Sequence, residues 1–367
     1  MMDLDMDYMQ QAIISAHSAL GLVSPNPAVG AVIVNSGNVV GLGATRLPGN
    51  DHAEIVALKQ AGEKANGAEL YVTLEPCSSY GKTPPCINSI ISSGISKIHV
   101  AILDPNPNES GNGIRELTKA GIEVLVYRED TLVSQAKQLI ESYSKYIVTG
   151  KPFITVKYAM SIDGKIATST GQSQWISGKE SRREVHRLRS ISDAIIVGIR
   201  TVLLDNPKLT ARNIDGQNME KQPLRVVIDT NGIIPIDSEL VSDGGSTLIV
   251  CTEMDPEKQK TLEFRGVIVE KVMKYGGQTD LTQLIEKLGQ KEITSVLVEG
   301  GSRISGGFID RGLVDKFVVF ISPIVLGGSD SLGPISGVGV DNIKDAVRFK
   351  ISQFKQYGDD IAIIGYA

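Results

Sequence analysis

The sequence is poor in cysteine, with three in 367 residues, which excludes the dense disulfide framework of a small secreted domain. It also lacks any apolar run near the roughly 20 residues that a membrane-spanning helix needs. The first ten residues, MMDLDMDYMQ, carry acids where a secretory signal carries lysine or arginine. We therefore expect a cytoplasmic protein with no membrane partner.

An excess of positive charge is missing as well, because 37 lysines and arginines face 42 acidic residues and leave a net charge of −5. Such a chain offers no general attraction to a phosphate backbone, so we expect no nucleic-acid partner, whereas small anionic substrates remain compatible. The hydrophobic content of 41% is ordinary for a globular protein. The length predicts two domains, each with its own core.

A set of metal ligands is what the chain does contain. His52, Cys77 and Cys86 supply one imidazole and two thiolates, which suit tetrahedral Zn²⁺ and leave the fourth position for water. Glu54 follows the histidine by two residues, where zinc deaminases carry the glutamate that moves a proton from water to the leaving amine. The pattern predicts one zinc ion and hydrolytic deamination, with Glu54 as the catalytic proton carrier.

The spacing differs from the common H-x-E…P-C-x-x-C pattern, because the segment SSYGKTPP separates the two cysteines. We interpret this insertion as a loop. An alternative is a surface His/Glu pair with two cysteines that are merely small buried groups. The metal interpretation is favoured because HAE opens a helical pattern and Pro76-Cys77 follows the strand-like LYVTL. Cys251, in TLIVC, is interpreted as a buried strand residue.

The apolar pattern predicts two α/β domains, residues 1–149 and 150–367, which meet near the segment VTGKPF. In the first, a mixed sheet lies between helices. In the second, continuous apolar runs such as AIIVG fit a parallel sheet that is covered on both faces. The expected strands are 28–34, 39–43, 70–74, 98–103, 123–127, 153–159, 194–198, 224–229, 247–251, 296–298 and 317–322. The expected helices include 4–20, 53–65, 131–146, 179–189, 281–288 and 302–311.

Longer segments resemble one family. SPNPAVGAVIV, HAEIVAL, YVTLEPCSSYGKTPPC and DPNPNESGNGI resemble the deaminase half of the bifunctional riboflavin-biosynthesis deaminase/reductases. VKYAMSIDGKIAT, SQWISG, SDAIIVGIRTVLLDNPKLTAR, VEGGSRISGGFI and PIVLGG resemble the reductase half, in the family's order. The resemblance implies a cytidine-deaminase-like domain, then a dihydrofolate-reductase-like domain, and a homo-oligomer formed through the latter.

The resemblance also implies the first substrate, 2,5-diamino-6-(5-phosphoribosylamino)pyrimidin-4(3H)-one, which is deaminated to the corresponding uracil. Asn26, in the turn SPNP, is our candidate for a hydrogen bond to the base or sugar, although it can equally be a turn former between two prolines. Lys82 is a candidate contact for the phosphate. Asp104 and Asn106 are candidates for the sugar hydroxyls.

Two positions depart from the family pattern. Many members carry a histidine where this chain has Val56, and another where it has Ser79. Neither position is a zinc ligand or the proton carrier. The departures therefore concern the details of substrate contact and leave the predicted reaction in place.

The second domain has no G-x-G-x-x-G fingerprint, so the sequence gives no support to a Rossmann site. The resemblance implies instead that NADPH delivers hydride to C1′ of the sugar, which turns a ribosylamino group into a ribitylamino group. Gly300 and Gly301 separate a predicted strand from a helix, where backbone amides can approach a pyrophosphate, although such junctions also occur without a ligand. The other predicted cofactor or sugar contacts are Thr155, Trp175, Thr201, Asp205 and Glu299.

Further residues are assigned to the second substrate, 5-amino-6-(5-phosphoribosylamino)uracil. Asp205 lies beyond the carboxyl end of a predicted strand, where open sheets place their ligands, and is our candidate for polarising the sugar or handling its proton. Its alternative is local capping in the DNP turn. Ser173 is a candidate hydroxyl donor to the substrate. Trp175 is either a cofactor or substrate platform or a core side chain. Lys157, Arg189 and Arg212 are candidate anchors for the phosphate.

Two other functions compete with this interpretation. One is a cytidine-type or nucleic-acid deaminase with a non-catalytic second module, against which the acidic balance and the motifs of the second half argue. The other is a zinc-stabilised structural or interaction protein, in which Glu54 would have no chemical role. The bifunctional interpretation explains both series of motifs with one substrate path.

Overall fold

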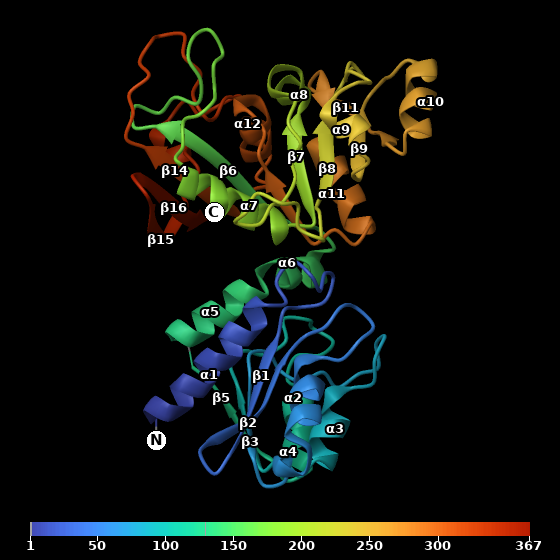
Figure 1. The fold of residues 1–367 in the computed structure, drawn as a ribbon, viewed down its shortest axis with the longest axis vertical. Coiled ribbons are helices and arrows are strands. Elements are labelled where there is room, and N and C mark those ends of the chain that lie inside the picture. The colour runs from blue at the N-terminus through green and yellow to red at the C-terminus, as the bar shows by residue number, and fades with distance from the viewer. Residues whose placement is uncertain (1, 129) are drawn as a thin grey trace. The chain divides into compact units, whose positions relative to one another are not determined.

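The computed structural model describes residues 2–128 and 130–367 and divides into two compact units, Met1–Gly150 and Lys151–Ala367. In both units, helices alternate with strands that form one main sheet (Figure 1). The α/β class predicted from the sequence is confirmed. Among the described helices, none is both long and apolar enough to cross a lipid bilayer.

The N-terminal unit is built on a five-stranded mixed sheet in the order β2-β1-β3-β4-β5. The strand β1 pairs antiparallel with β2 and β3, whereas β3, β4 and β5 run parallel. The strands are β1 (Gly30–Asn35), β2 (Asn38–Ala44), β3 (Glu69–Val72), β4 (Lys97–Val100) and β5 (Glu123–Val126).

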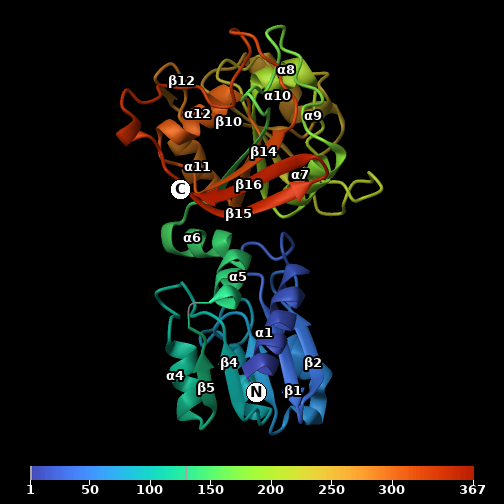
Figure 2. The same cartoon turned by 90° about the vertical axis from the view of Figure 1, so that its left-hand side faces the viewer.

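Helices cover both faces of this sheet (Figures 1 and 2). On one face α1 contacts β1 and α5, and on the other α2 contacts β2 and α3. The helices are α1 (Met2–His17), α2 (Ala53–Ala61), α3 (Cys86–Ser92), α4 (Asn112–Lys119), α5 (Thr131–Leu139) and α6 (Glu141–Thr149), with a short 3-10 helix η1 (Gly62–Ala65) after α2. The predicted single helix over 131–146 is wrong, because the backbone leaves the helical region at Ile140, with φ −115° and ψ 17°.

Glycines let two helices lie very close to the sheet. A Cβ atom at Gly30 would lie 1.9 Å from the carbonyl oxygen of Ala12 in α1. A Cβ atom at Gly43 would lie 2.1 Å from the carbonyl oxygen of Ala53, the first residue of α2. No side chain fits at such distances, so the missing side chains determine how far the helices stand from the sheet. The position of the α2 N-terminus follows from this contact.

The C-terminal unit contains a nine-stranded sheet in the order β10-β9-β8-β7-β13-β6-β14-β16-β15. The first seven strands in this order, from β10 through β14, run parallel. The last two, β16 and β15, are paired antiparallel. The strands are β6 (Phe153–Ser161), β7 (Ala194–Gly198), β8 (Leu224–Ile228), β9 (Thr247–Cys251), β10 (Ile268–Lys271), β13 (Ser295–Val298), β14 (Lys316–Ser322), β15 (Lys350–Tyr357) and β16 (Asp360–Tyr366).

Alternate residues of the central strands enter two separate apolar clusters, one on each face of the sheet, as the alternating geometry of a strand requires. Cys251 belongs to one of them and is fully buried. The helices are α7 (Lys179–Ser190), α8 (Ile199–Asp205), α9 (Glu239–Ser242), α10 (Pro256–Phe264), α11 (Leu281–Gln290) and α12 (Ser302–Asp310); a small hairpin, β11 (Lys274–Tyr275) and β12 (Gln278–Thr279), and the 3-10 helix η2 (Ile343–Asp345) complete the unit.

The antiparallel end of this sheet was not predicted. The segment of β15, KISQFKQY, contains no continuous apolar run, and most of its residues are exposed. A strand that buries neither face gives no periodic signal in the sequence. The parallel sheet that the apolar runs predicted is confirmed, and the antiparallel strands β16 and β15 extend it into a mixed sheet.

The close contact between β2 and α2 generates a first prediction. Gly43→Ala places a methyl group against the backbone of Ala53, and we expect it to lower the free energy of unfolding of the N-terminal unit by about 1–3 kcal/mol, as overpacking does. The control is Gly81→Ala, whose added Cβ meets nothing within 4 Å among the described residues. Chemical denaturation of both variants measures the difference, and equal stabilities would contradict the packing argument.

Candidate functional site

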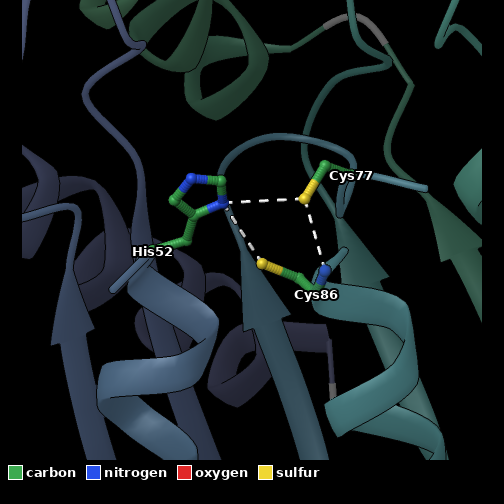
Figure 3. A group of neighbouring side chains, drawn as sticks. All are labelled: His52, Cys77 and Cys86. Carbon is green, nitrogen blue, oxygen red and sulfur yellow. Dashed lines mark hydrogen bonds between the residues drawn. The ribbon is translucent and has the colours of Figure 1, made fainter. Parts of the chain in front are cut away.

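The three predicted metal ligands meet at the N-termini of two helices (Figure 3). His52 is the N-cap residue of α2, Cys86 is the first residue of α3, and Cys77 lies in the segment between β3 and α3. Nδ1 of His52 lies 3.6 Å from Sγ of Cys77 and 3.3 Å from Sγ of Cys86. The three ligand atoms lie within 4.8 Å of one another, so one ion can contact all of them.

The chemistry of this donor set fits zinc. One imidazole nitrogen and two sulfurs form three corners of a tetrahedral site and leave the fourth for water. The backbone amide of Cys86 donates to Sγ of Cys77 at 3.3 Å, as an amide at a helix N-terminus can. Hydrogen bonds from Cys86 and His52 lower the pKa of the Cys77 thiol to about 5 against the effect of burial. A sulfur held in this way is prepared to bind a cation.

Glu54 lies in the first turn of α2, and only 4% of it is exposed. Burial and the nearby charge of Cys77 raise the pKa of its carboxyl to about 7. A carboxyl group with a pKa near neutrality can both accept and release a proton at physiological pH. The predicted proton carrier therefore lies buried on the same helix end that carries His52.

Sequence analysis did not identify Thr83. Its Oγ1 lies 3.2 Å from Nε2 of His52, the ring nitrogen that points away from the sulfurs. With Nδ1 as the ligand atom, Nε2 carries the proton and donates it to the hydroxyl. Such a contact fixes the tautomer and the orientation of a metal-binding imidazole. A threonine within an irregular loop carries no sequence signal for this role.

The candidate sugar contacts of the deaminase lie in one loop, residues 104–111. Oδ1 of Asp104 accepts hydrogen bonds from the amide of Asn106 at 2.8 Å and from the Tyr143 hydroxyl at 3.2 Å. Burial raises the pKa of Asp104 to about 6. The buried carboxylate of Glu75, which sequence analysis also missed, accepts from the amides of Asp104, Gly111 and Ile114. The loop is thus held at both of its ends.

The other deaminase candidates lie in different surroundings. Asn26 is half-buried in the turn before β1. Its backbone amide donates a hydrogen bond to the carbonyl oxygen of Val23 at 2.8 Å. Lys82 is exposed in the loop between the two cysteines. Of the two departures from the family pattern, Val56 is half-buried on α2, and Ser79 is exposed and donates a hydrogen bond to Glu109.

In the C-terminal unit, three of the predicted residues form one buried ion cluster. Glu299, whose side chain is 5% exposed, follows β13, and Lys157 lies on the neighbouring strand β6. Arg189, from α7, contacts both Glu299 carboxylate oxygens, at 2.6 and 3.0 Å, and Lys157 Nζ lies 2.7 Å away. Burial opposes the charge of Glu299, but the two cations hold its pKa well below the usual range. The cations are therefore paired with a carboxylate.

Arg212 joins this cluster through Thr210. The carbonyl oxygen of Thr210 accepts hydrogen bonds from Nη1 of Arg189 at 3.2 Å and from Nδ1 of His186 at 3.0 Å. The hydroxyl of the same residue accepts from Nε of Arg212 at 3.0 Å. The preceding residue, Leu209, has a φ of 53°, an uncommon conformation for a leucine. The structure thus brings Lys157, Arg189, Arg212 and Glu299 together around one loop.

A second group of predicted site residues consists of Ser173, Trp175 and Asp205. The hydroxyl of Ser173 donates to Asp205 at 3.4 Å, and Asp205 is exposed at the end of α8. Trp175 is 71% exposed, and the guanidinium of Arg182 lies 4.6 Å from the centroid of its ring. The alternative of a core tryptophan is therefore wrong. A surface ring near polar groups is suited to stack on a flat ligand.

The remaining cofactor candidates lie along adjacent strands and at the starts of the helices that follow them. Thr155 lies on β6 opposite Leu297, and Thr201 lies in the first turn of α8. Gly301 is the N-cap of α12, and within the described part of the chain no side chain caps this helix end. A Cβ atom at Gly300 would lie 2.5 Å from Cβ of Ile304, so no larger residue fits there. Free amides at a helix N-terminus suit a pyrophosphate.

Comparisons with known proteins agree over the whole chain. Residues 2–102 match the cytidine and deoxycytidylate deaminase zinc-binding region, and residues 152–363 match the RibD C-terminal domain. The riboflavin biosynthesis protein RibD of Aquifex aeolicus is 41% identical over 361 residues, which cover 98% of each chain.

Solved structures are similar as well. Acinetobacter baumannii RibD, form 1, has a TM-score of 0.87 with 34% identity, and the match covers 100% of this chain and 99% of that one. A diaminohydroxyphosphoribosylaminopyrimidine deaminase/5-amino-6-(5-phosphoribosylamino)uracil reductase from Thermotoga maritima has a TM-score of 0.84 with 33% identity over 99% of each chain.

The contact between Thr83 and His52 generates the second prediction. Thr83→Val keeps the shape of the side chain but removes the hydroxyl, and we expect zinc affinity to fall about 10- to 100-fold, as it does when such partners are lost. Thr118→Val, which removes an exposed hydroxyl bonded within α4, is the control. Competition with a chromophoric chelator measures both affinities, and a Thr83→Val protein that binds zinc as tightly as the wild type would contradict the assignment.

Proposed function

This chain belongs to the RibD family of riboflavin biosynthesis, and we propose that its two units catalyse consecutive reactions. The N-terminal unit hydrolytically deaminates 2,5-diamino-6-(5-phosphoribosylamino)pyrimidin-4(3H)-one. The C-terminal unit uses NADPH to reduce the ribosyl side chain of 5-amino-6-(5-phosphoribosylamino)uracil to ribityl. The observation that carries the proposal is the meeting of His52, Cys77 and Cys86 beside the buried Glu54.

For the deamination, His52, Cys77 and Cys86 would hold zinc. When bound, the zinc ion supplies the Lewis acidity that makes water a nucleophile near neutral pH. The Glu54 carboxylate takes a proton from the attacking water and returns it to the departing amine. Because Glu54 is buried at the start of α2, its proton is shielded from bulk water between these two transfers.

The substrate of the deaminase is held by loops around this centre. Asp104 and Asn106 bind the sugar hydroxyls, and the hydrogen bond between them supports a fixed arrangement of the two side chains. Lys82, exposed in the loop between the cysteines, reaches the phosphate. Asn26 binds the base or sugar from the turn that precedes β1.

For the reduction, the ion cluster binds and orients the phosphorylated sugar. Two cations and one carboxylate leave a net charge of +1, and Arg212 adds a further cation beside Thr210. Glu299 holds Lys157 and Arg189 in place, and its carboxylate also faces the sugar hydroxyls. Asp205, with Ser173 beside it, handles the proton at the sugar.

NADPH supplies the hydride when it is bound. Gly300 and Gly301 let its pyrophosphate reach the amides at the N-terminus of α12. A larger side chain at position 300 would clash with Ile304. Trp175 would stack on the cofactor, and Thr155 on β6 and Thr201 in α8 would hydrogen-bond to it. Thr155, Thr201 and the two glycines lie on or closely follow the neighbouring strands β6, β7 and β13.

Removal of the metal separates the two activities and gives the third prediction. We expect a chelator to abolish ammonia release from the diaminopyrimidine, while NADPH oxidation with pre-deaminated substrate continues, because the zinc ligands all lie in the N-terminal unit. Added zinc should restore ammonia release. Ammonia release that survives complete zinc removal would contradict this assignment of zinc to the N-terminal reaction. An NADPH reaction that stops when zinc is removed would contradict it as well.

We also propose a homo-oligomer formed through the reductase unit. The strand β15 is the end of the nine-stranded sheet, and its exposed residues include Phe354, of which 67% is accessible. An edge strand that exposes an aromatic side chain is a surface that a second copy can cover. We expect sedimentation to give the mass of two or more chains and Phe354→Lys to shift it to the monomer. A monomeric wild-type protein would exclude this arrangement.

We further propose a cytoplasmic location. Cys77, Cys86 and Cys251 are all free thiols in the structure, and two of them have to stay reduced to bind zinc. A reducing compartment keeps thiols in this state.

A further inference from the structure

One carboxylate close to the metal ligands has no role in the chemistry described above. Glu109 lies in the loop between β4 and α4 and is half-buried. Its Oε2 accepts hydrogen bonds from the amide of Ser78, at 3.2 Å, and from the Ser78 hydroxyl, at 2.9 Å. Its Oε1 accepts from the hydroxyl of Ser79. A single side chain thus binds the two residues that directly follow the ligand Cys77.

The loop bound by Glu109 surrounds the metal ligands. It begins after Cys77, passes through Thr83, whose hydroxyl contacts Nε2 of His52, and ends at Cys86. Glu109 holds its first two residues, and Thr83 is held near its other end. Three neutral donors converge on one carboxylate, and hydrogen bonds to an ionised acceptor are stronger than those between neutral groups. Although burial opposes ionisation, these serine contacts keep the pKa of Glu109 below its usual value.

Glu109 is equally fixed to the loop that carries the candidate sugar contacts. Its amide donates to the carbonyl oxygen of Asn106 at 2.9 Å, and the amide of Asn106 donates to Asp104. The amide of Gly111, two residues further on, donates to the buried Glu75 at 2.9 Å. The side chain of Glu109 therefore extends from a loop that is itself rigidly tied to the end of β3.

We propose that Glu109 is a positioning residue of the deaminase, which locks the loop between the two cysteines onto the loop that carries Asp104 and Asn106. In this way the metal ligand Cys77 and the groups that bind the sugar keep one relative arrangement. Glu109 itself touches neither the metal nor the substrate. The inference rests on the proposed deaminase function.

Ser79 supplies one of the contacts on which the proposal rests, because its short side chain places a hydroxyl against Oε1 of Glu109. The hydroxyl of Ser79 and the carboxylate of Glu109 form one hydrogen-bonded pair. Substituting either residue breaks the same contact, so the effects of the two substitutions should not add.

The test compares Glu109→Gln with Glu116→Gln in the full-length, zinc-loaded protein. Both variants remove one acidic charge from the same unit, but Glu116 lies exposed on α4 and pairs with Lys119 at 2.9 Å, away from both loops. For Glu109→Gln we expect KM for ammonia release to rise roughly tenfold, the equivalent of about 1.4 kcal/mol, with a smaller fall in kcat. Glu116→Gln and the NADPH reaction on pre-deaminated substrate should keep wild-type values.

A double-mutant cycle with Ser79→Ala separates positioning from a general loss of stability. Ser79→Ala should raise KM in the wild-type background and add little in Glu109→Gln, because the shared contact is already gone. Glu109→Asp, which keeps the charge, should recover part of the affinity for substrate. Unchanged KM and kcat in a folded, zinc-loaded Glu109→Gln protein, or fully additive effects in the cycle, would overturn the proposal.

A metal-centred measurement keeps this test independent of the proposed function. With cobalt in place of zinc, thiolate-to-metal absorption reports the geometry of Cys77 and Cys86 without any substrate. We expect this absorption band to shift in Glu109→Gln but not in Glu116→Gln. If the wild type releases no ammonia, the proposed function fails while the cobalt spectra still decide the role of Glu109; identical spectra in both variants would reject it.

Discussion

The deaminase site depends on how closely α2 lies against β2. Gly41 and Gly43 remove the side chains that would hold the helix away, so the backbone of α2 rests directly on the sheet. The first turn of this helix carries Glu54, and its N-cap is His52. Once that helix end is placed, the imidazole of His52 lies 3.3 Å from Sγ of Cys86 at the start of α3. The metal site is therefore defined by backbone packing, which is more precise than a site built on loops alone.

Buried carboxylates then connect segments that are distant in the sequence. Glu75 accepts three backbone amides and closes the loop 104–111 onto the end of β3. In the other unit, Glu299 joins β13 to Lys157 on β6 and to Arg189 on α7. An ionised group removed from water is costly unless it is fully paired, so each of these carboxylates requires its partners to stay in place. Both units thus use satisfied buried charge to hold the residues around their candidate sites.

The sequence predicted the α/β class and the three residues that meet as metal ligands, because apolar periodicity and the order of soft ligands are local signals. It missed β15, which is largely exposed and carries no periodic pattern. It also missed Thr83 and Glu109, whose contacts depend on how an irregular loop folds. The salt bridges that Lys157 and Arg189 make with Glu299, which lies 110 residues from Arg189, were not predicted. Such pairings exist only after the tertiary fold has formed.

We propose that the buried carboxylate of Glu54 drives deamination while an independent unit performs the reduction. The decisive measurement uses Glu54→Gln, which keeps the size of the side chain but removes its capacity to carry a proton. We expect this variant to bind zinc, to release no measurable ammonia from the diaminopyrimidine, and to oxidise NADPH at the wild-type rate with pre-deaminated substrate. Ammonia release at the wild-type rate by the zinc-loaded variant would show that Glu54 does not carry the proton.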